Sequence, residues 1–410
     1  MNLSLSFGRR SGADVVGLDI QPGFVAAVQA RVNGSILAER AAALPLAADT
    51  VRDGEVADES TLSDVLRELF AGSGMGKRVR VGVANQRTVL RTLELPPLTD
   101  QKELAAAVRF QAQDQVPMPL SNAVLDFHPL GVIDTPAGAR QRVVLVAAQR
   151  DMIERLLAAV RGAGLTPAGV DLSAFALIRS LYRPDPEGTG RVLYLNVDGL
   201  TNLAIAEGTV CRFTRVVGGG LEGMASELAV RRGIPVAEAH TLLAAVDLDA
   251  PAPAVADNET DEQVSVEPDA PDEEASEASL ASEADHEARE QDMSFEELAT
   301  VPRAPAPKPA AAGLDAAARE VLENGVHEIS GEVRNSLDFH RSQDGGGEVS
   351  RVVLSGAAQG VAGFASALEL SLGVEVRSER VDVADDAIAG VVSVHRLAVA
   401  AGLAATEAPQ

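Results

Sequence analysis

The stretch RVLYLNVDGLTNLAIAEGTVCRFTRVVGGG, residues 191–220, decides how the rest of the chain is interpreted. A first apolar run ends at Asp198-Gly199, a second extended run follows, and Glu207-Gly208 supplies a hairpin turn before a third run. Three glycines, 218–220, then open a helix. An acidic residue at a strand end, near a glycine-rich helix start, offers the groups that hold a metal-bound phosphate. Taken alone, the pattern fits an ordinary polar hairpin equally well.

The same pattern occurs earlier, in VVGLDIQPGFVAAVQARVNGSILAERAAA, residues 15–43. An apolar strand ends at Asp19, a turn contains Gly23, and Asn33-Gly34 forms a hairpin between two further extended runs. This is an internal duplication of a three-strand unit, spaced by about one domain length. For the matched pair we therefore predict two facing α/β halves around a cleft, each half contributing one aspartate.

Composition limits the function classes. The 410 residues suffice for two or three domains, and the single cysteine, Cys211, excludes an intramolecular disulfide and a cysteine-based zinc cluster. No apolar run reaches the length of a membrane span, and the start of the chain lacks the order of a signal peptide. We therefore expect a cytoplasmic protein without direct membrane insertion.

Most of the net charge of −25 is concentrated in one segment. Residues 249–300 contain 18 Asp and Glu against one base, Arg289, which gives −17 and leaves −25 + 17 = −8 for the rest. No basic stripe with interleaved aromatics is present, so nucleic-acid binding is not expected. Proline, alanine and like charge leave residues 249–312 too little apolar area to fold, which predicts a disordered insertion.

The remaining segments give a domain order. Residues 78–149 read as strands, one helix with Thr99 as its N-cap, and further strands, which is a small inserted subdomain. Helices are predicted over 314–341, despite Gly325 and Gly331, and over 386–403. The expected segments are a tail (1–13), the first part of the first half (14–77), the insert (78–149), helices completing that half (150–190), the second half (191–248 and 313–403) separated by the disordered insertion (249–312), and a second tail (404–410).

Three stretches resemble the PilM family of type IV pilus assembly proteins, FtsA-related members of the actin-like ATPase superfamily. They are LELPPLTDQKELAAAVRFQAQDQVPMPLSNAVLDFHPLG, VLVAAQRDMIERLLAAVRGAGLTPAGVDLSAFALIRSL and EISGEVRNSLDFHRSQ. The resemblance implies two actin-like (ribonuclease H-like) halves around a nucleotide cleft, with an FtsA-type inserted subdomain. It covers roughly residues 14–247 and 314–403.

The resemblance also implies a nucleotide site for ATP and Mg. Asp19 and Asp198 would hold the metal through water. The residues that match the phosphate and adenosine motifs are Gly17, Asp19, Asp198, Gly199, Thr201, Gly218, Gly219, Glu238, Ser355 and Gly356. The chain departs from these motifs at Gln21-Pro22-Gly23-Phe24, where no lysine follows, at Gly356-Ala357-Ala358, and at Leu243 near the place of a lysine. We therefore expect weakened nucleotide binding and at most a slow ATPase, with no catalytic residue assigned.

The family's function implies a cytoplasmic scaffold that binds the N-terminal tail of a PilN-like inner-membrane protein, together with other pilus assembly proteins. That tail would recruit the chain to the inner face of the membrane. The resemblance places the binding groove between the first actin-like half and the insert. The helix at 100–116 and its neighbouring strands are the candidates for it, with Arg109, Gln113 and Asp114 exposed on the helix. The alternatives are a functional actin-like ATPase and an FtsA-like division protein.

Overall fold

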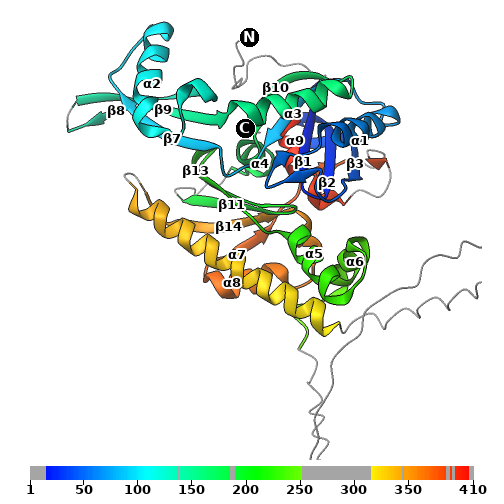
Figure 1. Ribbon diagram of the computed structural model, residues 1–410. Helices are drawn as coiled ribbons and strands as arrows, with labels where there is room; N and C mark the ends of the chain where they lie inside the picture. The colour runs from blue at the N-terminus through cyan, green and yellow to red at the C-terminus, as the bar shows by residue number, and fades with distance from the viewer. Residues whose placement is uncertain are drawn as a thin grey trace, which may run out of the picture. The chain divides into compact units, whose positions relative to one another are not determined.

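The computed structural model describes residues 15–136, 138–184, 190–251, 315–343, 346–384, 388–389 and 393–405. Most of these residues belong to two mixed β-sheets and the helices packed on them (Figure 1). The predicted acidic insertion and the two tails lie outside the described residues, apart from 249–251 and 404–405.

The first sheet has seven strands and contains the first predicted hairpin unit. Its order is β10-β6-β1-β2-β3-β16, and β17 also pairs with β3. β1, β2 and β3 are antiparallel neighbours, whereas β6 lies parallel to β1 and β10 parallel to β6. The strands are β1 (Val16–Gln21), β2 (Phe24–Asn33), β3 (Ser35–Pro45), β6 (Arg78–Val83), β10 (Thr166–Leu172), β16 (Asp382–Val383) and β17 (Ile388–Ala389). A separate short hairpin pairs β4 (Val51–Arg52) with β5 (Glu55–Val56).

The second sheet repeats this arrangement with five strands in the order β13-β12-β11-β14-β15. Three antiparallel strands are again followed by two parallel ones. The strands are β11 (Arg191–Val197), β12 (Thr201–Glu207), β13 (Val210–Val217), β14 (Val349–Ser355) and β15 (Val376–Ser378). The duplication read from the two hairpin units thus extends to the whole topology of each half.

Helices cover both faces of the first sheet. On one face lie α1 (Glu59–Ala71) and α3 (Arg150–Gly162), which contact each other. On the other face lie α4 (Ser173–Leu181) and α9 (Ala398–Ala404), and α4 also contacts β11, β12 and β13 of the second sheet. The core between the sheets is rich in alanine, because two helices and two sheets meet there at close range.

Two glycines make this close packing feasible. An ideal Cβ on Gly17 in β1 would lie 1.8 Å from the carbonyl oxygen of Ala400 in α9. One on Gly402 in α9 would lie 1.9 Å from the carbonyl oxygen of Ala176 in α4. The backbones of β1 and α9, and those of α9 and α4, are therefore in direct contact at these two positions. Any side chain there would push the two elements apart.

Four helices bury the outer face of the second sheet: α5 (Leu221–Arg232), α6 (Val236–Ala245), α7 (Ala316–Ser342) and α8 (Phe364–Leu372). α7 is the long predicted helix and begins at Asp315, whose side chain accepts hydrogen bonds from the Ala317 and Ala318 backbone N–H groups. α7 continues through Gly325. The missing side chain at this position leaves room for the side chain of Met224 in α5. Among the described helices, none has the length and apolarity to cross a bilayer.

The insert is a three-stranded sheet, β7-β9-β8, with one helix packed on it. Its elements are β7 (Val89–Leu95), α2 (Gln101–Gln115), the 3-10 turn η1 (Leu120–Asn122), β8 (Ala123–Thr135) and β9 (Gly138–Gln149). Two details differ from expectation. β6, placed in the insert by sequence, belongs to the first sheet. Asp100, not Thr99, caps α2, because the carboxylate accepts from the Lys102 and Glu103 N–H groups.

The end of the described chain differs most from expectation. In place of one helix over 386–403, the structure has β17, the 3-10 turn η3 (Val394–Arg396) and the short helix α9. A further 3-10 turn, η2 (Ala357–Gly360), follows β14. β16, β17 and α9 all pack on the first sheet, although sequence placed this segment in the second half. The chain therefore returns to the first half between β15 and β16, and η3 then contacts η2 of the second half.

Candidate functional site

The two turns that follow β1 and β11 touch each other directly. The backbone N–H of Leu200 donates to Oε1 of Gln21 at 3.4 Å. An ideal Cβ on Gly199 would lie 2.4 Å from the carbonyl oxygen of Pro22. The turns expected to lie on either side of a phosphate group are therefore in contact with each other.

Asp19 lies in β1, two residues before the end of that strand at Gln21, and is only 2% exposed. Its Oδ2 accepts a hydrogen bond from Nε2 of Gln21 at 2.9 Å. Burial raises the pKa of Asp19 to about 7, an effect that the hydrogen bond from Gln21 partly offsets. The side chain at position 21, which departs from the family pattern, thus satisfies one aspartate and bridges to the other turn.

Asp198 begins the β11–β12 turn and is 1% exposed. Nε of Arg396 lies 3.0 Å from its Oδ1, and the Ala357 backbone N–H also donates to the carboxylate. Burial raises the pKa of Asp198 to about 7; Arg396 opposes this shift, whereas nearby Asp19 adds to it. The partners of this carboxylate come from the chain itself.

Arg396 reaches this position from η3, a turn that follows β17 of the first sheet and contacts η2 of the second half. Its guanidinium carbon lies 4.4 Å from the ring centroid of Phe24, the first residue of β2. The preceding residue, His395, is held by Nδ1 at 2.8 Å from Oε1 of Gln359 in η2. Arg396 therefore contacts an aromatic ring of the first half and a carboxylate of the second.

The structure brings together several predicted site residues around these aspartates. Thr201 donates from Oγ1 to the Gly219 carbonyl oxygen at 2.8 Å, and Ser355 pairs with Asn196 in the sheet. Gly356 has φ +93°, and a Cβ there would lie 2.4 Å from the Val197 carbonyl oxygen. Gly218 and Gly219 are exposed beside the start of α5.

Two predicted residues stand apart from this group. Gly17 faces the backbone of α9, and Glu238 is exposed on α6. The acidic side chain that reaches the turns is Glu222 of α5, whose carboxylate lies where a Cβ on Gly23 would be. Nε2 of His240 lies 2.7 Å from Oε2 of Glu222 and orients it.

This geometry does not fit a magnesium-bound nucleotide. A metal held through water needs carboxylates that water can reach, yet both aspartates are buried and Asp198 is paired with Arg396. The turns that would flank the phosphates are themselves in contact. The two turns and the side chain of Arg396 instead form direct contacts between the two halves, and we call this set of contacts the joint.

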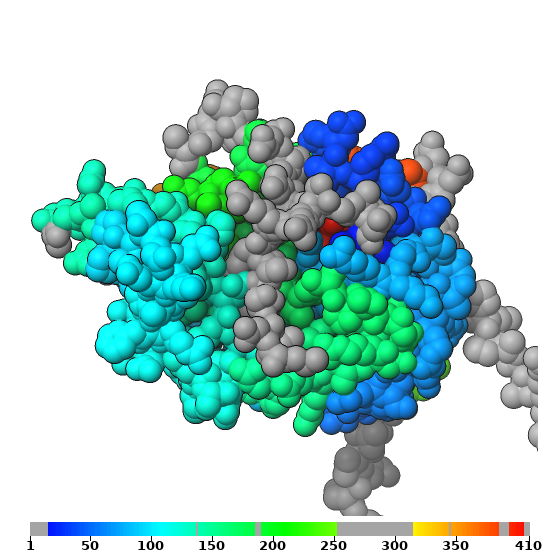
Figure 2. All heavy atoms as spheres, turned by 90° about the horizontal axis from the view of Figure 1, so that it is seen from above, coloured from blue at the N-terminus to red at the C-terminus, as the bar shows by residue number. Residues whose placement is uncertain are grey.

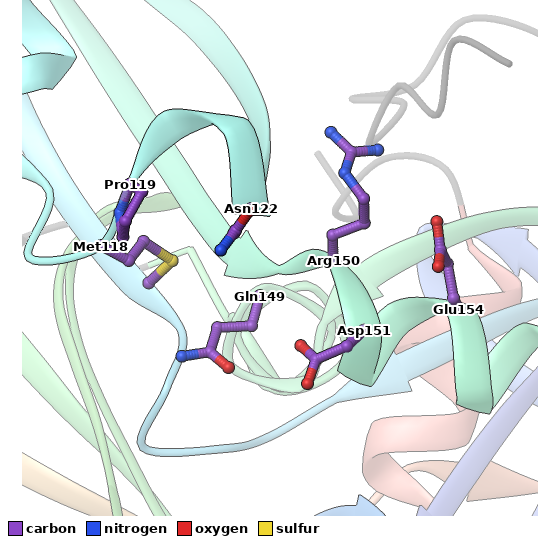
Figure 3. Close-up of a pocket in the computed structure, with 7 residues that line it drawn as sticks. All are labelled: Met118, Pro119, Asn122, Gln149, Arg150, Asp151 and Glu154. Carbon is purple, nitrogen blue, oxygen red and sulfur yellow. The ribbon is translucent and has the colours of Figure 1, made fainter.

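A cavity of about 380 Å³ lies where the insert meets the first half. Met118 and Pro119 come from the loop after α2, and Asp151 and Glu154 from the first turns of α3, as Figure 3 shows. The other lining residues are Asn122, Gln149 and Arg150. The cavity therefore combines an apolar side from the insert with a charged side from α3, where Arg150 stands beside Asp151 and Glu154. In the space-filling view, the insert (cyan) projects beside the blue and green surface of the first half (Figure 2).

Arg87, in the segment between β6 and β7, contacts two of the residues that line this pocket. Nη1 of Arg87 lies 2.6 Å from Oε2 of Glu55 in β5, and Nη2 lies 3.6 Å from Oδ2 of Asp151. Arg87 also donates to the side chain of Gln149. The pocket thus has a charged frame that ties the base of the insert to the first half.

The residues predicted for a partner groove do not line this pocket. Arg109, Gln113 and Asp114 are exposed on α2, whereas the lining residues begin just after that helix at Met118. The stretch VPMPLSN, residues 116–122, contains the sequence signal that could have located the pocket. Two prolines flank a methionine there, between a predicted helix and a predicted strand.

The duplicated sheets, the facing turns and the insert define an actin-like fold. Residues 17–189 match the family model described as type IV pilus assembly protein PilM. The predicted resemblance to the PilM family and the predicted actin-like fold class are thereby confirmed.

The fold is shared with a solved structure. The chain is similar to a chain of a structure titled "PilM-PilN type IV pilus biogenesis complex", with 20% identity, a TM-score of 0.65, and coverage of 95% of this chain and 97% of that one. It is also similar to the ethanolamine utilization protein EutJ from Carboxydothermus hydrogenoformans, at 15% identity and a TM-score of 0.47, covering 95% of this chain and 88% of that one. MreB5 of Spiroplasma citri bound to ADP matches at 11% identity and a TM-score of 0.45, covering 95% and 94%.

Sequence reasoning missed Arg396, Glu222 and the role of Gln21. Gln21 was visible as a departure from the family pattern, and a glutamine in place of small hydroxyl residues indicates a side chain that spans a gap. Arg396 gave no such signal, because it lies in a Val- and Ala-rich stretch whose periodicity suggested helix. Only the crossing of the chain between the sheets places it beside Asp198.

Proposed function

We propose that this chain is a cytoplasmic scaffold of type IV pilus assembly that binds the N-terminal tail of a PilN-like inner-membrane protein. The partner would hold the scaffold at the inner face of the membrane, and other pilus proteins would join through it. The observation that carries the proposal is the pocket between Met118 and Asp151, at the junction of insert and first half. The fold it shares with a chain of the PilM–PilN complex supports it.

The chemistry of the pocket suits such a tail. Segments on the cytoplasmic side of a membrane span are enriched in lysine and arginine. Asp151 and Glu154 offer carboxylates to such side chains, while Met118 and Pro119 offer an apolar surface beside them. A short extended peptide with an apolar anchor and a basic neighbour is the ligand that this combination fits.

The nucleotide is not needed for this role, and we propose that ATP and Mg binding is weak. A functional ATPase would need the two phosphate turns to separate, and Gln21 and Arg396 oppose that separation. An actin-like ATPase and an FtsA-like division protein are therefore the less favoured readings.

Neutralising the acidic side of the pocket is expected to weaken tail binding. In the double variant Asp151→Asn/Glu154→Gln, affinity for a synthetic PilN-type tail peptide should fall roughly 10-fold at low salt, because two charge contacts near the rim are lost. The variant should also lose most of the salt dependence seen with the unmodified protein. Isothermal titration calorimetry at two salt concentrations measures both effects.

The matched control is Asp338→Asn, which removes an equally exposed carboxylate on α7, in the second half of the chain. It should bind the peptide as the unmodified protein does. If the pocket variant and the control bind equally well, the tail does not use this pocket. If the unmodified protein binds no tail peptide from the neighbouring pilus genes, the proposed scaffold role is wrong.

A further inference from the structure

The ion pair between Arg396 and Asp198 occupies the place where an actin-like cleft would need a cation. Asp198 is 1% exposed and the side chain of Arg396 is 21% exposed, so the pair is largely withdrawn from water. A carboxylate this deeply buried requires a compensating charge or a proton. Arg396 is the cation that the chain itself supplies.

The position of Arg396 in the chain makes it a link between the halves. Immediately before it, His395 is anchored to Gln359 beside β14, in the second half. Immediately after it, α9 packs on β1 and α4 in the first half. The Arg396 side chain also connects the two halves, because it pairs with Asp198 of the second half and lies over the ring of Phe24 in the first half.

Contacts on the opposite turn reinforce the link. Gln21 donates to Asp19 and accepts from the Leu200 N–H, so it joins its own half to the other turn. The carboxylate of Glu222 lies against Gly23 and is held by His240. Side chains of this protein therefore contact both of the turns, after β1 and after β11, that would flank a bound phosphate.

We propose that Arg396 is a built-in counterion that locks the two halves together, replacing the metal and nucleotide that would otherwise bridge them. The lock extends the proposed scaffold function, since it keeps the first half and its insert rigid without a nucleotide cycle. It does not depend on tail binding, which is a separate measurement at a separate pocket. Its failure and the failure of the scaffold role are therefore distinguishable.

A double-mutant cycle tests the lock. Arg396→Gln should reduce the folding equilibrium constant on the order of 100-fold, because it leaves the buried Asp198 carboxylate without its cation. The same substitution made in an Asp198→Asn background should cost much less, since no buried carboxylate then remains to be compensated. Urea unfolding of the full chain measures all four proteins.

The control is Arg341→Gln, which breaks an exposed pair with Asp338 and should leave stability nearly unchanged. If Arg396→Gln lowers the folding equilibrium constant by the same factor with and without Asp198→Asn, the two side chains are not coupled and the proposed lock is wrong. If Arg396→Gln does not fold, Arg396→Lys serves in its place, because it keeps a charge but loses the planar group over Phe24.

Magnesium-ATP and magnesium-ADP provide an independent test. Neither should raise the thermal unfolding midpoint of the unmodified protein, because the turns are already joined. A saturable rise would show that the cleft accepts the nucleotide with Arg396 in place, and the inference would be wrong. Variants that fold should still bind the tail peptide as the unmodified protein does.

Discussion

Replacing Gly17 by alanine is expected to destabilise the protein by at least about 3 kcal/mol. The new Cβ would lie 1.8 Å from the Ala400 carbonyl oxygen and 2.6 Å from the Ala404 backbone nitrogen. Neither atom belongs to a side chain that could rotate away, so β1 and α9 would have to separate. Because β1 is central in its sheet and α9 fills the space between the halves, the loss is global. Urea unfolding followed by circular dichroism measures it.

Gly331→Ala is the matched control. This glycine lies within α7, and no heavy atom lies within 4 Å of the position of its Cβ. Alanine there should stabilise the protein by up to about 1 kcal/mol through helix propensity alone. If Gly17→Ala instead folds with normal stability and loses only nucleotide binding, then Gly17 is a phosphate-binding residue and not a packing residue.

The contrast between these glycines shows what the sequence could and could not predict. The strand–turn–strand units were predictable because their signals are local: apolar runs, Asn33-Gly34 and Glu207-Gly208. Their repetition then predicted the two halves. Gly17 carries the same local signal as a phosphate-binding glycine, and only the tertiary position of α9 shows what its bare face does.

Composition carried more tertiary information than any single motif. Aromatic residues make up only 3% of the chain and tryptophan is absent, a composition that favours close packing of helices on sheets. The core between the sheets consists largely of alanine and small side chains around α4 and α9. The close approach of the two sheets also reduces the width of the cleft between the halves, because the turns after β1 and β11 come into contact. The family resemblance implied a groove between the insert and the first half, but the residues that line the pocket beside α3 could not be predicted, since they come from segments that only the tertiary structure brings together.

The second large effect concerns pH and involves Asp19. Burial raises the pKa of this carboxyl from 3.8 to about 7. Below pH 4 both the folded and the unfolded chain hold the proton. Between about pH 4 and 7 the unfolded chain releases it while the folded chain retains it, so the free energy of unfolding falls as pH rises. Above pH 7 both forms are ionised and the loss is complete.

Asp19→Asn should remove this contribution. An amide oxygen can still accept the hydrogen bond from Gln21, and asparagine carries no charge to desolvate. We expect the variant to be more stable than the unmodified protein at pH 8, by an amount on the order of 4 kcal/mol, and equally stable near pH 4. Asp198 retains its own raised pKa, so the variant should keep a weaker pH dependence.

Urea unfolding at pH 4, 6 and 8 measures these differences, with Asp338→Asn controlling for the loss of one exposed carboxylate. Parallel pH profiles for Asp19→Asn and the unmodified protein would mean that water reaches Asp19 in solution. The turns would then stand apart, and the joint between the halves would be open enough for a metal-bound phosphate. A pH profile that flattens in Asp19→Asn supports a closed joint, because burial is the main cause that raises the pKa of this carboxyl.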